Sequence, residues 1–228
     1  MSGGGDLHQC AIIEWCFAGY DVMKIAVMIM AAGESRRFGE CKLLTAVSQT
    51  ENLLSRSIQQ TSQSDVGPVF VITGRWHQEI KLAQQQGQVP IVPLIYCPQW
   101  SQGLGASIAY GVRQLAPDFD AVLITLADQV ALQSEDFQQL VEAASSQQLV
   151  EAASSQHIVC AYYNQRRGVP ALFPVSCFSQ LTMLNGEHGA RSLLRGDTTS
   201  VREISLPNAA LDIDTPEMLM RWRYEFAK

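Results

Sequence analysis

One stretch of sequence decides the fold: MKIAVMIMAAGESRRFGECK, residues 23–42. Residues 25–30 are all apolar, which is typical of a strand covered on both faces in a mainly parallel sheet. The small residues that follow let backbone N–H groups approach an anion closely: Ala31, Ala32 and Gly33. Three cations come next: Arg36, Arg37 and Lys42. The stretch predicts a buried strand that leads into an anion-binding loop.

The rest of the chain alternates between strand-like and helix-like segments. Further apolar runs predict strands at 69–73, 91–96, 121–126, 158–163 and 171–173. Helix-compatible segments cover 52–60, 76–86, 107–114, 134–144, 190–194 and 216–226. This alternation predicts a three-layer α/β/α fold with a mainly parallel sheet, whose ligands lie at the carboxyl ends of the strands.

Composition excludes several classes of protein. With 228 residues, 47% of them hydrophobic, the chain is long enough for one large core. Its net charge of -6 disfavours a broad surface for nucleic acid or for an anionic membrane. The six cysteines include no CxxC pair, so we expect free thiols in a cytoplasmic protein, with neither a zinc site nor a disulfide framework. No segment has the length or apolarity of a signal peptide or a transmembrane helix.

Two segments stand apart from the expected domain. Residues 1–22 begin with the linker-like MSGGGDLHQ, so we expect an N-terminal extension outside the core, followed by a single domain over 23–228. The extension is either loosely docked or a contact patch for a partner. The sequence QQLVEAASS occurs at 138–146 and again at 147–155, and this tandem duplication predicts an extended helix end or a surface loop.

Other strand ends also carry charged groups. Asp128 follows the apolar run AVLITL, where a carboxylate would hold Mg²⁺ against phosphates, although an Asp here also serves as a helix cap or turn former. Asp212 and Asp214 precede Pro216, a pattern that equally describes the N-terminus of a helix. The loop after residue 30 fits neither GxGxxG nor GxxxxGK[ST], which disfavours a dinucleotide-binding fold and a Walker-type P-loop. The loop alone also leaves open that Gly33 only ends the strand and that the arginines are solvated.

Taken together, the motifs resemble those of the MobA-like nucleotidyltransferases. The resemblance rests on AAGESRRFGECK, WSQGLGASIAYGV, LADQV, GVPALF, NGEHGAR and DIDTPE, in this order over nearly the whole chain after the leader. Within that family it is strongest to the molybdenum cofactor cytidylyltransferases. The resemblance implies a Rossmann-like nucleotidyltransferase whose first loop binds a nucleoside triphosphate.

Matching the donor motifs position by position implies a set of site residues. The signature loop falls on Ala31, Ala32, Gly33, Ser35, Arg37, Gly39 and Lys42, with Arg37 and Lys42 contacting the triphosphate. Asp128 and Asp214 match the family's Mg²⁺ ligands. The segment expected against base and ribose contains Gly103, Gly105 and Ser107. Two alanines before Gly33, in place of Ala-Gly-Gly, favour CTP over GTP.

The acceptor side matches less well. The resemblance implies that Gly168, Pro170 and Arg191 line the acceptor phosphate site, although Arg191 also fits a surface salt bridge at a helix start. Three positions depart from the family pattern: Val130 and Cys41 replace prolines, and Glu187 replaces aspartate. Cys41 lies beside Lys42. Its thiol therefore either has a lowered pKa or is an ordinary, inert thiol.

The implied reaction is transfer of CMP from CTP to the terminal phosphate of molybdenum-loaded molybdopterin, with release of pyrophosphate. A molybdoenzyme or its maturation chaperone would receive the product. Two alternatives stay open at this point. In the first, the protein is a related transferase that uses another nucleotide such as GTP, or that acts on a sugar phosphate or other small phosphorylated acceptor. In the second, it is a regulatory or delivery module that binds nucleotide without turnover.

Overall fold

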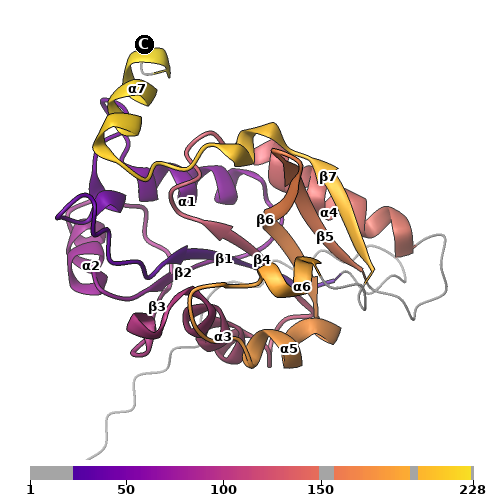
Figure 1. Ribbon diagram of the computed structural model, residues 1–228. Coiled ribbons are helices and arrows are strands. Elements are labelled where there is room, and N and C mark those ends of the chain that lie inside the picture. The colour runs from indigo at the N-terminus through magenta and orange to yellow at the C-terminus, as the bar shows by residue number, and fades with distance from the viewer. Residues whose placement is uncertain (1–22, 149–156, 196–199, 227–228) are drawn as a thin grey trace, which may run out of the picture.

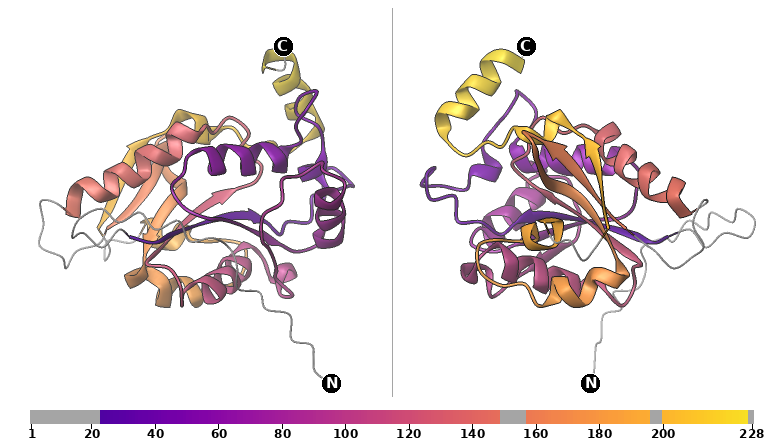
Figure 2. Two further views of the ribbon diagram at one scale, coloured as in Figure 1. Left: turned by 180° about the vertical axis from the view of Figure 1, so that it is seen from behind. Right: turned by 45° about the vertical axis from the view of Figure 1, so that its right-hand side comes forward.

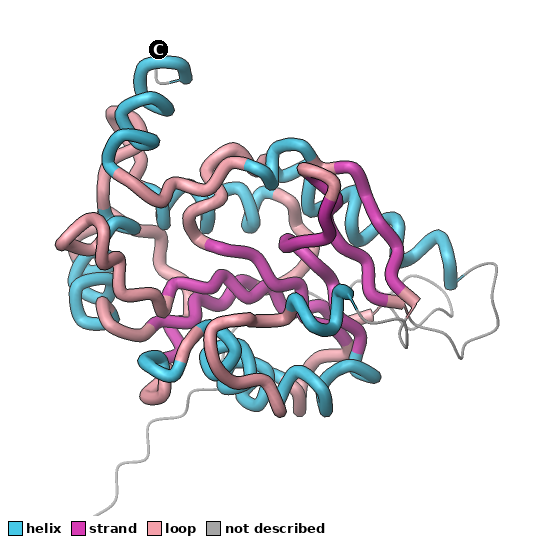
Figure 3. The backbone as a smooth tube through the Cα atoms, in the orientation of Figure 1, coloured by secondary structure: helices cyan, strands magenta, loops and turns pink. Residues whose placement is uncertain are grey.

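The computed structural model describes residues 23–148, 157–195 and 200–226. Seven strands form a single sheet in the order β3-β2-β1-β4-β6-β5-β7 (Figures 1 and 3). Their bounds are β1 Ile25–Ala31, β2 Val69–Thr73, β3 Leu94–Tyr96, β4 Ala121–Leu126, β5 Ile158–Tyr163, β6 Arg166–Pro174 and β7 Val201–Ser205. Only β6 runs against its neighbours β4 and β5, while the other pairings are parallel. The prediction of a mainly parallel sheet is confirmed.

Helices cover both faces of this sheet (Figure 2). The α-helices are α1 Leu53–Gln63, α2 His77–Gln85, α3 Leu104–Leu115, α4 Ser134–Gln148, α5 Phe178–Thr182, α6 Arg191–Arg195 and α7 Pro216–Phe226. Short 3-10 helices cover Lys42–Leu44, Trp100–Gln102, Val175–Cys177 and Pro207–Ala210. No helix among the described residues is both long and apolar enough to cross a membrane.

The alternation of side chains along β1 explains the two layers. Val27 and Ile29 point into one core, which also contains buried residues of α1, α2, α4 and α7. Met28 and Met30 point into the other, with α3, α5 and α6. Because both faces are covered, every residue of β1 is buried, as its continuous apolar run predicts.

Three expectations about the elements were wrong in detail. The strand expected over 91–96 begins only at Leu94, because Pro90 and Pro93 interrupt the run and proline cannot donate to a ladder. The strand expected at 171–173 extends from Arg166 to Pro174, since a tight turn through Asn164 and Gln165, both with positive φ, pairs it with β5. No sequence pattern indicated β7 or α5.

Two predicted segments lie partly or wholly outside the described residues. The expected N-terminal extension, residues 1–22, is one of them, so its role and its boundary with the domain stay predictions. The first copy of the nine-residue duplication, 138–146, belongs to α4, which ends at Gln148. Residues 149–156, most of the second copy, are not described.

The C-terminal helix α7 projects from one end of the molecule (Figure 1). Leu219 and Trp222 anchor it in the core, and Arg223 Nε donates to the carbonyl of Ala46 at 2.8 Å. α7 therefore lies against the loop that follows Lys42, at the same end of the sheet as the candidate site.

Candidate active site

The carboxyl ends of β1 and β4 bring two of the motifs together. The two strands are parallel neighbours in which Met30 pairs with Leu126, and the amide of Ala127 donates to the carbonyl of Met30 at 3.2 Å. The loop after β1 and Asp128 after β4 consequently meet at one edge of the sheet, where ligands of open α/β sheets bind.

Lys42 joins the two predicted metal ligands. Its ammonium donates to Asp128 Oδ2 at 2.6 Å, to the carbonyl of Ile213 at 3.1 Å and to Asp214 Oδ1 at 3.3 Å. The side chains of Lys42 and Asp128 are only 15% and 18% exposed, whereas Asp214 is half exposed. Three residues that are far apart in the sequence thus form one charged cluster, while their contacts with metal and triphosphate stay predictions.

The cluster perturbs the ionisation of its members. Burial lowers the pKa of Lys42, but the neighbouring carboxylates of Asp128 and Asp214 outweigh burial, and the net shift is upward. Burial, reinforced by Asp128 and Asp214, raises the pKa of Asp212 to about 6. The cluster thus combines carboxylates, which are suited to binding a cation, with an ammonium that stays charged and is suited to binding polyphosphate.

The divalent cation implied by the resemblance fits these residues. Oδ1 of Asp128 and Oδ1 of Asp212 are buried and accept no hydrogen bond, which a hard cation or its water ligands would remedy. Within the described ranges no group of three or more His, Cys, Asp or Glu side chains is placed to hold a metal by itself. Mg²⁺ typically binds to one or two carboxylates and completes its shell with phosphates and waters. Asp128 and Asp214 would therefore hold Mg²⁺ together with a bound triphosphate.

The loop after β1 is folded back on itself. Ser35 adopts a positive φ of 55°, its carbonyl accepts from the amide of Phe38 at 2.9 Å, and its hydroxyl accepts from the amide of Lys42 at 3.4 Å. Arg37 lies 3.7 Å from Asp214 Oδ2 and is 70% exposed. Arg36, which the motif comparison left out, pairs instead with Glu34. Arg37 and Lys42 thus lie on the same side of the loop as Asp214.

The small residues of this loop leave room beside it. Ala31 and Ala32 are buried at the end of β1, and Gly33 is exposed with open space where a Cβ would stand. The structure is compatible with the predicted approach of phosphate to this backbone. The contact of Ala31, Ala32 and Gly33 with nucleotide stays a prediction.

Gly103 and Gly105 have a packing role that the motif reading missed. A Cβ on Gly103 would lie 2.5 Å from the carbonyl of Gly186, and one on Gly105 would lie 2.5 Å from the carbonyl oxygen of Asn185. The amide of Gly105 donates to the carbonyl of Gly186 at 2.8 Å. The glycines therefore let the start of α3 contact the NGEHGAR segment. Their expected contact with base and ribose is not tested by this geometry.

Ser107 is directed into the protein. It is 1% exposed, and its hydroxyl donates to the carbonyl of Gly103 at 3.4 Å. This internal bond supports the first turn of α3, so a nucleotide contact through the Ser107 hydroxyl stays a prediction.

The predicted acceptor residues lie around the β5–β6 hairpin and the start of α6. Gly168 packs against Tyr163, whose hydroxyl would collide with any Cβ at that position. Pro170 follows Val169 through a cis peptide bond and is buried. Arg191 is the first residue of α6 and is exposed, and no carboxylate of the described residues pairs with it. The alternative of a surface salt bridge at Arg191 is thus absent from the described part of the chain.

Tyr163 and Arg166 extend this side of the site. The Arg166 guanidinium lies 5.5 Å from the centre of the Tyr163 ring. Burial and the charge of Asp212 raise the pKa of Tyr163, and Arg166 and Arg191 oppose that shift. Two arginines therefore approach one tyrosine beside Asp212, an arrangement that suits an anionic acceptor.

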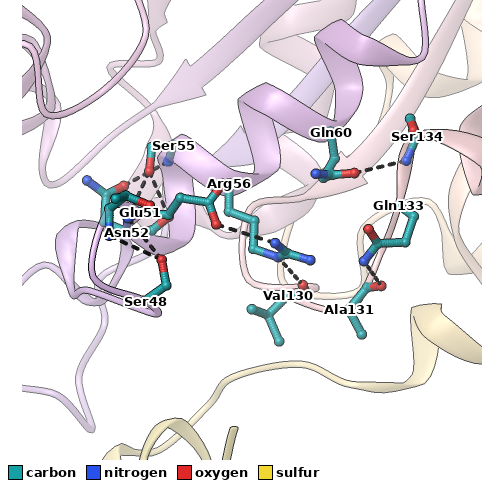
Figure 4. Close-up of polar contacts among 11 residues, drawn as sticks. Ser48, Glu51, Asn52, Ser55, Arg56, Gln60, Val130, Ala131, Gln133 and Ser134 are labelled. Carbon is teal, nitrogen blue, oxygen red and sulfur yellow. Dashed lines mark hydrogen bonds and ion pairs between the residues drawn. The ribbon is translucent and has the colours of Figure 1, made fainter. Parts of the chain in front are cut away.

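A network of polar contacts braces the segment that follows Asp128 (Figure 4). Arg56 of α1 donates from Nε to the carbonyl of Val130 at 2.7 Å, and its guanidinium also contacts Glu51. Gln60 accepts from the amide of Ser134 at 3.1 Å. α1 thereby holds the loop that carries a predicted metal ligand.

A cavity of about 230 Å³ lies beside this network, between α7 and the loop after Lys42. Its lining residues include Glu51, Arg56, Gln133, Trp222 and Phe226. Arg56 lies 5.7 Å from the centre of the Trp222 ring, whose other neighbour is the stacked ring of Phe226. Arg56 thus lines the cavity and also binds the carbonyl of Val130, two residues after Asp128.

The sequence reading missed two residues of the site. Asp212 appeared in the DIDTPE motif without a role, yet its carboxylate adds to the charge around Lys42. Gln129 follows Asp128 directly, is 4% exposed and uses its carboxamide to join three chain segments. A polar residue within an apolar segment was the available signal for Gln129.

Comparison with known proteins identifies the family. Residues 27–203 match the family described as MobA-like NTP transferase domain. The chain belongs to this family. It is therefore a nucleotidyltransferase with a nucleotide substrate, which confirms the resemblance at this level.

Individual relatives agree with this membership of the MobA-like family. The purine catabolism protein PucB of Bacillus subtilis is 29% identical over 198 residues, which are 83% of this chain and 91% of that protein. Among solved structures, Rv0371c from Mycobacterium tuberculosis superimposes with a TM-score of 0.71 at 20% identity, over 87% of this chain and 97% of that one.

Two further structures share the fold. Rv0371C in complex with manganese has a TM-score of 0.67 at 18% identity, over 89% of this chain and 99% of that one. The molybdopterin-guanine dinucleotide biosynthesis protein A of Archaeoglobus fulgidus has a TM-score of 0.59 at 16% identity, over 89% and 97%. At these identities the structures show that the fold is shared.

Proposed function

We propose that this nucleotidyltransferase transfers CMP from CTP to the terminal phosphate of molybdenum-loaded molybdopterin and releases pyrophosphate. The observation that carries the proposal is the contact of the Lys42 ammonium with both Asp128 and Asp214 at the carboxyl ends of β1 and β4. The double alanine at 31 and 32 supports CTP as the donor. The Archaeoglobus structure is named for the biosynthesis of molybdopterin-guanine dinucleotide, which supports a pterin phosphate as the acceptor but carries a guanine base.

The chain's own residues supply position and charge for this transfer. Lys42 and Arg37 would contact the triphosphate and stabilise negative charge as it moves onto the departing pyrophosphate. Arg191, with Gly168 and Pro170, would orient the acceptor so that its phosphate oxygen attacks the α-phosphorus in line as the bond to pyrophosphate breaks. No side chain needs to act as a nucleophile.

Asp128 and Asp214 would hold Mg²⁺, which when bound neutralises charge on phosphate oxygens. The manganese complex of Rv0371C supports a divalent cation in this fold. We assign the reaction to the cytoplasm, with a molybdoenzyme or its maturation chaperone as the recipient of the product.

The experiment is pyrophosphate release with Mg²⁺ and molybdenum-loaded molybdopterin, with CTP, GTP, ATP and UTP compared in parallel. Release with CTP supports the proposal, and release with GTP instead would keep the chemistry but change the base. Release only with a sugar phosphate would replace the acceptor. If a folded protein releases none with any pair, the chain is a nucleotide-binding module without turnover.

A matched pair of variants tests the site within the same assay. Asp128→Asn removes the charge of a carboxylate that contacts Lys42, and we expect turnover to fall by about a hundredfold or more. Asp118→Asn removes the same charge at an exposed position after α3. Equal turnover in the two variants would overturn the assignment of Asp128.

A further inference from the structure

The side chain of Gln129 joins three segments that meet at the site. Its Nε2 donates to the carbonyl of Val169 at 2.8 Å and to the carbonyl of Ala209 at 2.9 Å. Its Oε1 accepts from the amide of Leu126 at 3.3 Å and from the hydroxyl of Thr125 at 3.4 Å. Both donors and both acceptor positions of the carboxamide are thus used, and these partners fix the orientation of the amide.

The joined segments carry the residues of the site. Gln129 directly follows Asp128, and Ala209 lies just before the segment with Asp212 and Asp214. The backbone adds to this connection, because the amide of Ile213 donates to the carbonyl of Asp128 at 3.0 Å. On the other side, Val169 lies between the predicted acceptor residues Gly168 and Pro170.

We propose that Gln129 is a positioning residue, which fixes the separation between the Asp128–Asp214 pair and the segment 168–170. The assignment of 168–170 to the acceptor rests on the proposed function, whereas the position of the carboxylates does not. Without the carboxamide, two buried carbonyls on different segments lose their donors, and each segment gains freedom to shift. A displacement of about 1 Å between reacting groups is enough to cost on the order of a hundredfold in rate.

The chain provides a matched control for this proposal. Gln84 of α2 also donates from one Nε2 to two carbonyls, those of Pro90 at 2.9 Å and Val92 at 3.0 Å, and these partners lie outside the segments that carry Asp128, Asp214 and residues 168–170. In both Gln129→Glu and Gln84→Glu, a carboxylate oxygen would face two carbonyl oxygens. The two substitutions thus make the same chemical change, with and without connection to the site.

The first test is amide hydrogen exchange on the full-length protein without nucleotide or metal, each variant measured at the same margin below its own melting temperature. In Gln129→Glu we expect exchange in peptides covering 166–172 and 207–214 to be on the order of tenfold faster than in the wild type. In Gln84→Glu the increase should be confined to the region around 88–93. Equal exchange of the site peptides in both variants would overturn the proposal.

The second test is Mn²⁺ binding followed by electron paramagnetic resonance. We expect Gln129→Glu to weaken Mn²⁺ binding about tenfold, as loss of outer support for metal ligands does, and Gln84→Glu to leave it unchanged. Should Gln129→Glu fail to fold, Gln129→Met removes the donors at similar volume and is expected to show the same two effects. Wild-type Mn²⁺ affinity together with wild-type exchange in a folded Gln129 variant would refute the positioning role.

These two readouts are independent of turnover. If the wild type releases no pyrophosphate from any nucleotide, the proposed function fails, but hydrogen exchange and Mn²⁺ binding still decide the role of Gln129. If the wild type is active, Gln129→Glu should also raise KM for the acceptor by more than it raises KM for the nucleotide. An unchanged KM for the acceptor would separate Gln129 from the segment 168–170.

Discussion

The contact of Lys42 with two carboxylates leads to a prediction about the variant Lys42→Met. The ammonium lies 2.6 Å from Asp128 Oδ2 and 3.3 Å from Asp214 Oδ1, and methionine keeps much of the length of the side chain but has no charge. In the variant, Asp128, Asp214 and the nearby Asp212 would face one another without the counter-charge. A divalent cation would then bind at the same carboxylates without competition from an ammonium.

The magnitude follows from these distances. At an effective dielectric constant of about 20, the two attractions amount to about 6 and about 5 kcal/mol, and the loss of hydration of the ions cancels most of this. Removing one partner of a buried pair costs about 3–5 kcal/mol, and we take about 3 because Asp214 is half exposed. For a protein of this size that corresponds to a fall in melting temperature of about 6–12 °C.

The assay is thermal unfolding near neutral pH with increasing Mn²⁺, read by circular dichroism. At the same Mn²⁺ concentration, we expect the melting temperature of Lys42→Met to rise by more than that of the wild type, since stabilisation by a ligand increases with the logarithm of its concentration divided by its Kd. Lys81→Met is the control, because it removes the same charge from an exposed position on α2. An equal or smaller increment in Lys42→Met than in the wild type would show that Lys42 and the cation do not share these carboxylates.

Three further predictions concern Asp212, Cys41 and Gly105. Because the pKa of Asp212 is about 6 in the native state and lower in the unfolded chain, its protonation stabilises the metal-free protein at low pH, and this contribution is lost as the pH rises through 6. Asp212→Asn should therefore have a higher free energy of unfolding than the metal-free wild type at neutral pH, and this difference should shrink near pH 4. A difference in urea unfolding that does not change with pH would contradict this. Burial raises the pKa of the Cys41 thiol to about 11. Iodoacetamide at pH 8 should therefore label Cys41 at least tenfold more slowly in the folded protein than in the urea-unfolded chain. Equal labelling rates in the two states, measured by mass spectrometry, would show that the thiol is not inert. Gly105→Ala should push α3 away from Asn185 and lower the free energy of unfolding by about 1–3 kcal/mol. The control is Gly87→Ala at an exposed position with open space around it, where a positive φ makes backbone strain the only cost.

The sequence predicted the fold better than it predicted the site. The apolar run of β1 required a strand covered on both faces, and the structure shows both layers around it. β7 escaped prediction because its two apolar residues, Val201 and Ile204, are three positions apart and do not show the alternation of a strand, and α5 because five residues carry too little periodicity.

The site could be predicted where a charged residue comes soon after a strand. Asp128 lies two residues after the end of β4, and its meeting with Lys42 follows from the pairing of β1 with β4. The contacts of Gln129 with Val169 and Ala209 depend on how three loops pack, and no local pattern encodes them. The same limit applies to the backbone contact of Gly105 with Gly186, which no local pattern indicated.

Thr215 resolves an ambiguity of the DIDTPE motif. Its hydroxyl accepts from the amide of Met218 at 3.3 Å, so Thr215 caps α7, with Pro216 as the first helical residue. Asp214 is thus not needed as the cap and contacts Lys42 instead. The helix-start reading therefore applies to Thr215 and Pro216, and the metal-ligand role of Asp214 stays a prediction.

The two prolines that this chain lacks are each replaced by another source of rigidity. Cys41 has a φ of -68°, close to the angle that proline enforces, and its carbonyl accepts from the amide of Leu44 at 3.1 Å. The amide of Val130 donates to the carbonyl of Asp128 at 2.9 Å, a bond that proline cannot form, while Arg56 binds the carbonyl of Val130. Hydrogen bonds therefore restrain both loops where a ring would otherwise do so.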